Sequence, residues 1–114
     1  MKLDQVIKEL ELEILTGPKD FDEIPVSGVY ASDLLSCVMS SAKKQNLWLT
    51  LQAHINIVAV AALLELSAVI ITENAQPDAA TIEKANQQEV TLLSSAQDTY
   101  TLAGKLWALG LQHE

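Results

Sequence analysis

The chain has 114 residues, 49% of them hydrophobic, and a formal net charge of −8. This length suits one domain with its own hydrophobic core, spanning residues 1–114, and the apolar content excludes a disordered chain. The acidic balance excludes nucleic acid and anionic membrane surfaces as natural partners, because both would repel the protein.

The single cysteine, the N-terminus and one long apolar run indicate where in the cell the protein is located. One cysteine, Cys37, forms neither an internal disulfide nor a multi-cysteine metal site, which fits a reducing compartment. The N-terminus lacks the apolar core of a signal peptide. Residues 55–72 are strongly apolar, but polar residues interrupt them and their last part is β-branched. This pattern favours a buried helix and a buried strand over a membrane span, so we expect a cytoplasmic protein.

Hydrophobic periodicity and capping residues predict the elements of the first half of the chain. We expect a helix capped by Asp4, a strand over 12–15, an acidic loop over 19–25, a strand over 26–31 with a bulge at Gly28, a helix capped by Asp33 that closes at Lys43 and Lys44, and a strand over 47–51.

In the second half, residues 56–66 predict a helix that is apolar nearly all round, and hence buried on more than one side, one layer being a second subunit. Further on we expect a central parallel strand over 68–72, a helix from Asp78 to Glu89, a strand over 90–93, and a last helix capped by Ser95, with Tyr100, Ala103, Leu106 and Trp107 inward and its end at Gly110. The alternation of strands and helices from residue 47 onward predicts an α/β fold with a mostly parallel central sheet.

Polar side chains gather where the predicted strands end. In an open parallel sheet, ligands bind outside the carboxyl ends of the strands, close to helix N-termini. The candidate ligand-binding residues at these ends are Thr50, Gln52, His54 and Asn56 after one strand, Glu73 after the next, and Tyr30, Ser32 and Asp33 after an earlier one. Ser94 and Ser95 follow the last strand. The alternative is that Asn56 is only a helix cap and His54 a hydrogen-bonded loop histidine.

The motifs of several common chemistries are absent. The loop TLQAHIN has neither the glycines of a dinucleotide-binding fingerprint nor the glycines and lysine of a P-loop. His54 with Asp33 or Glu73 lacks the spacing of a metal site, so we expect no metal and no cofactor. Cys37 is best interpreted as a packing residue, and Ser32 with His54 and Asp33 lacks a nucleophile elbow.

The segments that carry a family resemblance are VYASDLLSCVMSSAKKQNLWLTLQAHINIVAVA, SAVIITENAQPDAATIEKANQQEVTLLSS and TYTLAGKLWALG. They resemble the DRTGG domain family, especially its small stand-alone members, through their hydrophobic pattern and a T-x-Q-x-H-x-N segment. The string D-R-T-G-G itself is absent. The resemblance implies a fold like the N-terminal domains of HPr kinase/phosphorylase and the Mur ligases. It also implies regulation or assembly rather than catalysis, with stand-alone members accessory to iron-only hydrogenase or other redox systems.

Three functions follow, in order of preference. The first is a non-enzymatic regulatory or protein-interaction module that forms a homodimer, accessory to a redox system. The second is a sensor that binds a nucleotide or another phosphate compound at the Thr50–Asn56 junction. The third is an enzyme with His54 as general base, assisted by Asp33 or Glu73.

Overall fold

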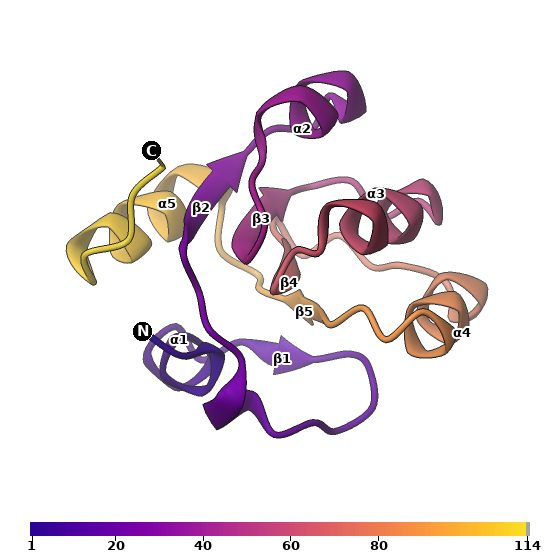
Figure 1. Ribbon diagram of the computed structural model, residues 1–114, viewed down its shortest axis with the longest axis horizontal. Helices are drawn as coiled ribbons and strands as arrows, with labels where there is room; N and C mark the ends of the chain where they lie inside the picture. Colours follow the sequence, from indigo (N-terminus) through magenta and orange to yellow (C-terminus); the bar gives the residue numbers. More distant parts are fainter. Residues whose placement is uncertain (114) are drawn as a thin grey trace.

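The computed structural model describes residues 1–113 and contains one five-stranded sheet (Figure 1). Its order is β1-β5-β4-β3-β2, and all neighbours pair in parallel except β1, which is antiparallel to β5. The strands are β1 (Glu13–Ile14), β2 (Gly28–Ala31), β3 (Asn46–Thr50), β4 (Ala68–Ile71) and β5 (Leu92–Ser94). The predicted α/β fold with a mostly parallel sheet is confirmed.

Helices cover both faces of the sheet (Figure 1). They are α1 (Leu3–Glu9), α2 (Leu35–Ser41), α3 (Asn56–Leu64), α4 (Ala79–Gln87) and α5 (Thr99–Ala108), with a short 3-10 turn η1 (Phe21–Glu23). Leu47 and Leu49 of β3 pack in one core with α1 and α5, whereas Trp48 between them packs in a second core with α2, α3 and α4. Because successive side chains point to opposite faces, a strand covered on both faces is apolar without alternation.

Three helix starts differ from the prediction. Helix α1 has Lys2 as its N-cap, and Asp4 lies in its first turn, where a carboxylate still suits the helix dipole. The N-cap of α2 is Leu34, because the Asp33 side chain bonds to β3 instead. The N-cap of α5 is Asp98 rather than Ser95, and its carboxylate accepts a hydrogen bond from the Thr101 amide at 2.7 Å.

The other element boundaries are partly confirmed. Asp78 caps α4 as predicted, accepting from the Thr81 amide at 2.8 Å. Helix α2 ends at Ser41, so the two lysines predicted to close it lie beyond its end, and β5 begins two residues later than predicted. Gly28 is no bulge: it pairs regularly with Asn46, and a Cβ at this position would lie 2.3 Å from the carbonyl oxygen of Gln112. The glycine therefore permits the C-terminal segment to approach β2.

The predicted inner face of α5 is wrong at two of its four positions. Tyr100 and Trp107 are 90% and 63% exposed, whereas Leu106 is buried as predicted, together with Leu102. Helix α3 ends at Leu64 and packs against β4, α2 and α4, so it is buried on more than one side, as predicted. Leu63 is 68% exposed, and the covering of this side by a second subunit stays a prediction. No helix within residues 1–113 is long and apolar enough to cross a bilayer.

Candidate functional site

The carboxyl ends of β2 and β3 meet in a hydrogen-bonded cluster that we call the closed junction: Asp33, Thr50, Leu51 and Gln52. The Asp33 carboxylate oxygen Oδ1 accepts from the Thr50 hydroxyl and from the Leu51 amide, both at 2.8 Å. The Thr50 hydroxyl oxygen in turn accepts from the Gln52 amide at 3.0 Å. The fully buried Thr50 side chain therefore has both of its hydrogen-bonding roles filled from within the chain.

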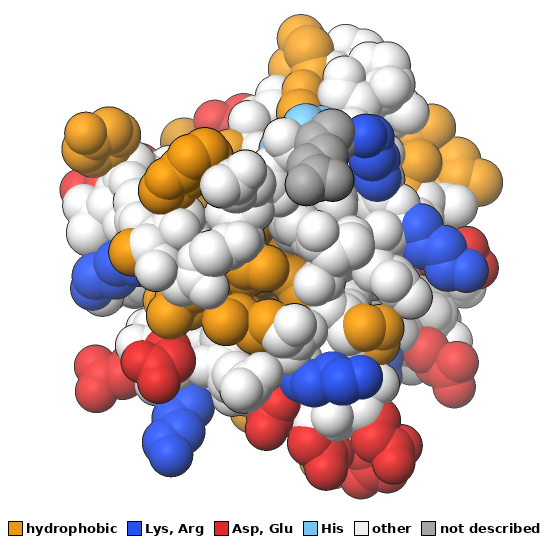
Figure 2. Space-filling view, turned by 60° about the vertical axis from the view of Figure 1, so that its left-hand side comes forward, with side chains coloured by type: hydrophobic (Ala, Val, Ile, Leu, Met, Phe, Trp, Pro, Cys, Tyr) orange, Lys and Arg blue, Asp and Glu red, His pale blue; other side chains and the backbone are white. Residues whose placement is uncertain are grey.

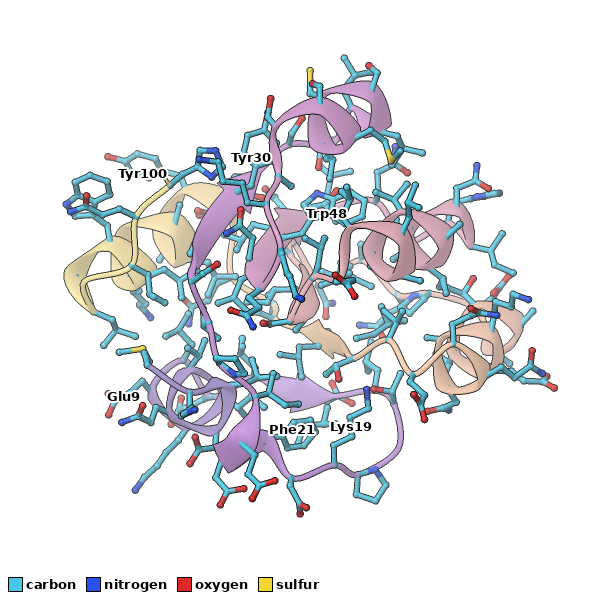
Figure 3. The ribbon with its side chains drawn as sticks, in the orientation of Figure 1. Glu9, Lys19, Phe21, Tyr30, Trp48 and Tyr100 are labelled. Atoms are coloured by element: carbon cyan, nitrogen blue, oxygen red, sulfur yellow. The ribbon has the colours of Figure 1, made fainter. Side chains whose placement is uncertain are left out.

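Ser32 and Tyr30 are the other two residues predicted for this end of the sheet. The Ser32 hydroxyl accepts from the Leu34 amide at 3.2 Å, and the Ser32 carbonyl accepts from the Trp48 indole at 2.8 Å. Tyr30 points elsewhere, with its ring centroid 5.0 Å from that of His113 near the C-terminus (Figure 3). The structure thus brings Ser32 to the junction and separates Tyr30 from it.

His54 and Asn56 lie at the start of α3. Asn56 is the first helical residue rather than the N-cap, which is Ile55, and its amide donates to Nδ1 of the exposed His54 at 3.2 Å. Hydrogen bonds from Thr81 lower the pKa of Asp78, and the nearby charge of His54 lowers it further.

Glu73 belongs to a third place. Its backbone is in the left-handed region at a φ of 62°, and its carboxylate accepts from the Thr99 amide at 3.3 Å. Its own amide donates to the carbonyl of Gln97 at 2.9 Å. Glu73 thus fastens the end of β4 to the start of α5.

The positions of His54, Asp33 and Glu73 bear on whether these residues could act together in catalysis or bind a metal ion. Each of His54, Asp33 and Glu73 is hydrogen-bonded to a different partner, and no hydrogen bond among residues 1–113 joins the histidine to either carboxylate. In the same residues, no group of three or more His, Cys, Asp or Glu side chains is placed to hold a metal ion.

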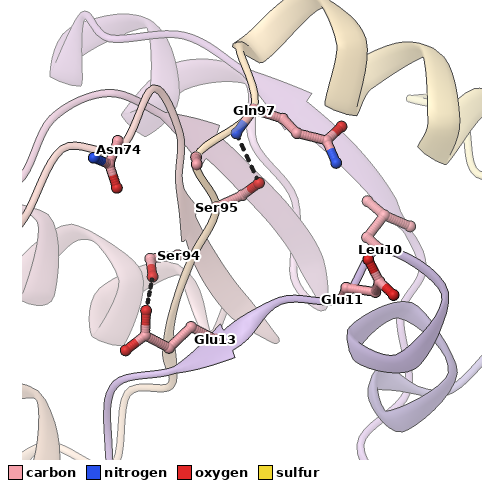
Figure 4. A pocket seen from close by; sticks show the side chains of 8 residues that line it. Leu10, Glu11, Glu13, Asn74, Ser94, Ser95 and Gln97 are labelled. Atoms are coloured by element: carbon pink, nitrogen blue, oxygen red, sulfur yellow. Dashed lines mark hydrogen bonds between the residues drawn. The ribbon is translucent and has the colours of Figure 1, made fainter.

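The end of β5 opens into a cavity of about 270 Å³, which we call the acidic cavity (Figure 4). It is lined by Leu10, Glu11, Glu13, Asn74, Ser94, Ser95, Ala96 and Gln97. The two serines were among the polar residues that the sequence places at strand ends. Sequence reasoning missed the two glutamates because β1 runs antiparallel, which brings its first residue, Glu13, opposite Ser94.

A second hollow of about 180 Å³, which we call the apolar groove, lies between β2, α5 and the C-terminal segment. It is lined by Val29, Ala31, Ala103, Leu106, Trp107, Leu111, Gln112 and His113. Figure 2 shows hydrophobic side chains gathered on the side of the molecule that carries α5. Trp107, wrongly predicted as inward, forms part of one wall of this groove.

The basic side chains avoid both hollows. All seven are lysines, and the chain contains no arginine. None of these lysines lines the acidic cavity or the apolar groove. Lys19, whose pKa burial lowers, donates instead to the carbonyl of Glu89, before the start of β5. The acidic cavity therefore lacks the cations that usually hold phosphate groups.

Comparisons with known proteins identify the family. No curated protein matches the chain. A solved structure, described as the CBS and DRTGG domains of the regulatory region of Clostridium perfringens pyrophosphatase complexed with an activator, diadenosine tetraphosphate, is similar with a TM-score of 0.72 and 18% identity. The match covers 90% of this chain and 44% of that one. The DRTGG domain profile matches residues 5–109, and the chain therefore belongs to the DRTGG domain family.

Proposed function

We propose that the protein is a non-enzymatic regulatory module that acts as a homodimer through the apolar groove. The observation that carries this proposal is the exposed aromatic face of α5 beside that groove. Trp107 is 63% exposed and also lines the groove, and Tyr100 on the same helix is 90% exposed. Buried aromatic side chains dominate the energy of most protein interfaces, so their exposure here favours a protein contact.

The helix face is shaped for close contact. Tyr100, Gly104 and Trp107 follow helical spacing along one side of α5, and a Cβ at Gly104 would meet nothing within 4 Å. In a twofold contact, the same patch serves as projection and as recess. Trp107 of one copy would then enter the apolar groove of the other.

Charge favours a second copy as the occupant. The molecule carries a formal charge of −8, so most pairs of surfaces on two copies repel each other. The apolar groove has no Asp, Glu or Lys among its lining residues. Two copies can therefore approach through this face without bringing like charges together.

The test compares an acid placed on α5 with the same change on α3, the surface first expected to meet a second subunit. We expect a dimer mass by light scattering at micromolar concentration and a dissociation constant raised about 30-fold or more by Trp107→Glu, as for loss of an aromatic hot spot. Leu63→Glu is the matched control and should remain dimeric. A monomeric wild-type protein, or dissociation by Leu63→Glu alone, would contradict this assignment.

The regulatory part of the proposal is supported by the family. The similar solved structure belongs to the regulatory region of a pyrophosphatase. A place in the cytoplasm stays a prediction from the single cysteine and the N-terminal sequence, and a role accessory to an iron hydrogenase-type redox system stays a prediction from the resemblance. With one cysteine, half-buried in α2, the chain lacks the thiolates that hold an iron–sulfur cluster, so redox chemistry would reside in a partner.

A second candidate is a nucleotide sensor at the closed junction and the adjoining start of α3. Its support is the diadenosine tetraphosphate bound to the regulatory region of the similar protein. Leu34, Leu51 and Ile55 are 61%, 46% and 38% exposed around this junction and offer an apolar rim for a base. Against it stand the Asp33 carboxylate and the absence of arginine.

The nucleotide candidate is tested by the melting temperature of the wild-type protein with diadenosine tetraphosphate and with ATP. Ligand at about 100 times its dissociation constant would add ~2.7 kcal/mol to stability. His54→Ala should weaken any such binding, and Glu83→Gln on α4 should not. If neither diadenosine tetraphosphate nor ATP shifts the melting temperature, the protein is not a sensor of these two nucleotides.

A further inference from the structure

Helices α2 and α3 contain no charged residue. Both helices cover the side of the sheet on which Trp48 is buried, and they contact each other (Figure 1). All fifteen acidic residues of the chain lie outside residues 34–64, and within this range only Lys43 and Lys44, which follow the end of α2, are charged. We call the exposed surface of α2 and α3 the uncharged face. The negative charge of the molecule therefore resides outside it.

The exposed side of α3 is a row of apolar side chains. Ile55, Ala59 and Leu63 follow one another at a spacing of four residues, and all three are exposed. Ile55 is the N-cap, but its φ of −56° and ψ of −24° are helical, so it continues the row. Residues four apart lie on the same side of a helix. The row is therefore high at Ile55 and Leu63 and low at the small alanine between them.

The spacing of this row favours a helix as the occupant. Side chains four residues apart form the ridges that pack into the grooves between the side chains of another helix. The low position at Ala59 admits one large side chain of that helix between Ile55 and Leu63. Met39 of the adjacent α2 is 41% exposed and adds apolar surface to the same face. An amphipathic helix that lies along α3 would cover these side chains.

The charge of the molecule favours a basic partner over a second copy. A formal charge of −8 attracts a basic protein, whereas a second copy brings the same negative charge. Lys44 forms an ion pair with Glu65 at 3.5 Å, which offsets its charge beside the uncharged face. The homodimer proposed above uses α5, which packs on the opposite side of the sheet. A closed twofold dimer of that kind leaves α3 free in both copies.

We propose that the uncharged face binds an amphipathic helix of another protein, whose apolar side is flanked by basic residues. The apolar row of α3 supplies the contact area, and the charge of the whole molecule attracts the basic flanks. This proposal goes beyond the regulatory role and does not rest on the homodimer, because the two surfaces lie on opposite sides of the sheet.

The test is a selection from displayed helical peptides that share one apolar side and have flanking positions drawn equally from lysine, glutamate and serine. Selection on the wild-type chain should enrich flanks of net positive charge. The most enriched peptide, made synthetically, should bind saturably at micromolar concentration by fluorescence anisotropy, and its affinity should fall as salt rises. No enrichment, or enrichment of acidic or uncharged flanks, would overturn the proposal.

Alanine variants then locate the binding of this peptide. Ile55→Ala and Leu63→Ala should each weaken it about tenfold, as for truncation of an interface hot spot. The matched control is Ile14→Ala, which removes apolar surface from β1, where Ile14 is 42% exposed. Circular dichroism verifies that each variant folds, and the control should bind the peptide as the wild type does.

The results separate this face from the homodimer. Unchanged affinity in both α3 variants, or equal weakening in all three variants, would contradict binding at the uncharged face. The mass of each variant by light scattering reports on self-association independently of the peptide. Dissociation of the dimer by Leu63→Ala would show that a second copy covers α3, and it would overturn the proposal as well.

Discussion

The closed junction and the acidic cavity lie at the same edge of one sheet, yet they differ in how their polar groups are used. At the closed junction, Asp33, Thr50 and the following amides bond to one another. At the acidic cavity, the carboxylate of the exposed Glu13 accepts from the Ser94 hydroxyl at 3.3 Å and otherwise lies open to solvent. Polar residues after a strand therefore bond to one another in one place and line an open hollow in the other.

The difference arises from the neighbouring strands. Ala31 of β2 lies beside Leu49 of β3 in parallel register, so the residues that follow each strand meet directly and bond. One of the two neighbours of β5 is instead the antiparallel β1, which brings Glu13 to the end of β5 from the opposite direction. The residues that follow two neighbouring parallel strands lie side by side and hydrogen-bond to each other. A neighbouring antiparallel strand begins at that edge, so it places no such residues there.

The largest effect is expected from the tryptophan that supports the closed junction. Trp48 of β3 is fully buried on the side of the sheet that α3 covers, and its indole donates to the Ser32 carbonyl (Figure 3). Trp48→Ala should lower the free energy of unfolding by about 3–5 kcal/mol. Trp107→Ala, on the exposed face of α5, is the matched control. Urea unfolding of both at a concentration that keeps them monomeric is the measurement, and equal midpoints would contradict the prediction.

A direct comparison of the two sites is the next largest effect. Asp33→Ala removes the acceptor of the buried Thr50 hydroxyl and should cost about 1–3 kcal/mol. Glu13→Ala removes one of the two carboxylates of the cavity and should change stability by less than ~0.5 kcal/mol. The measurement is the midpoint of urea unfolding for each variant, and the lower midpoint is expected for Asp33→Ala. A larger loss for Glu13→Ala would mean that the cavity is structural and the junction is not.

The smallest effect is in the pH dependence beside the cavity. The Thr101 amide and then its hydroxyl hold the pKa of Asp98 below its ordinary value. Its folded-state pKa is depressed, so this stabilisation is present above the unfolded value of about 3.9 and is lost as pH falls through the folded value. Asp98→Asn still caps α5 but does not titrate.

Unfolding free energies measured across that acidic range should therefore fall less steeply for Asp98→Asn than for the wild type. Asp78→Asn should give a similar flattening, because hydrogen bonds from Thr81 lower the pKa of Asp78 in the same way. A pH profile that is identical in the wild type and both variants would show that neither cap contributes to acid unfolding.

The sheet was predictable because its strands are short apolar runs separated by helices, and both faces of β3 and β4 are buried. Helix caps were less predictable, because an aspartate before a helix has other partners to choose from. Asp33 bonds across to β3, whereas Asp98, three residues after the predicted cap, accepts from Thr101. Local sequence does not distinguish these outcomes.

The sequence indicated which polar residues follow the strands, but not which strand end opens into a hollow. The segment from Thr50 to Asn56 has the right residue types, but a pattern of types does not show which hydrogen bonds are already made. The acidic cavity depends on the antiparallel pairing of β1, a contact between residues 81 positions apart in the chain for Glu13 and Ser94. Such a contact leaves no periodic signal in either segment.

The approach of the C-terminal segment to Gly28 has a consequence for the solubility of the protein. The carbonyl of Gln112 accepts from the Val29 amide at 3.1 Å and so covers part of an edge strand that could otherwise pair with another chain. Any side chain at position 28 would collide with that carbonyl. Gly28, which has no Cβ, therefore allows the C-terminal segment to cover the edge of β2. This covering hinders the addition of a strand from another chain, the first step toward aggregation.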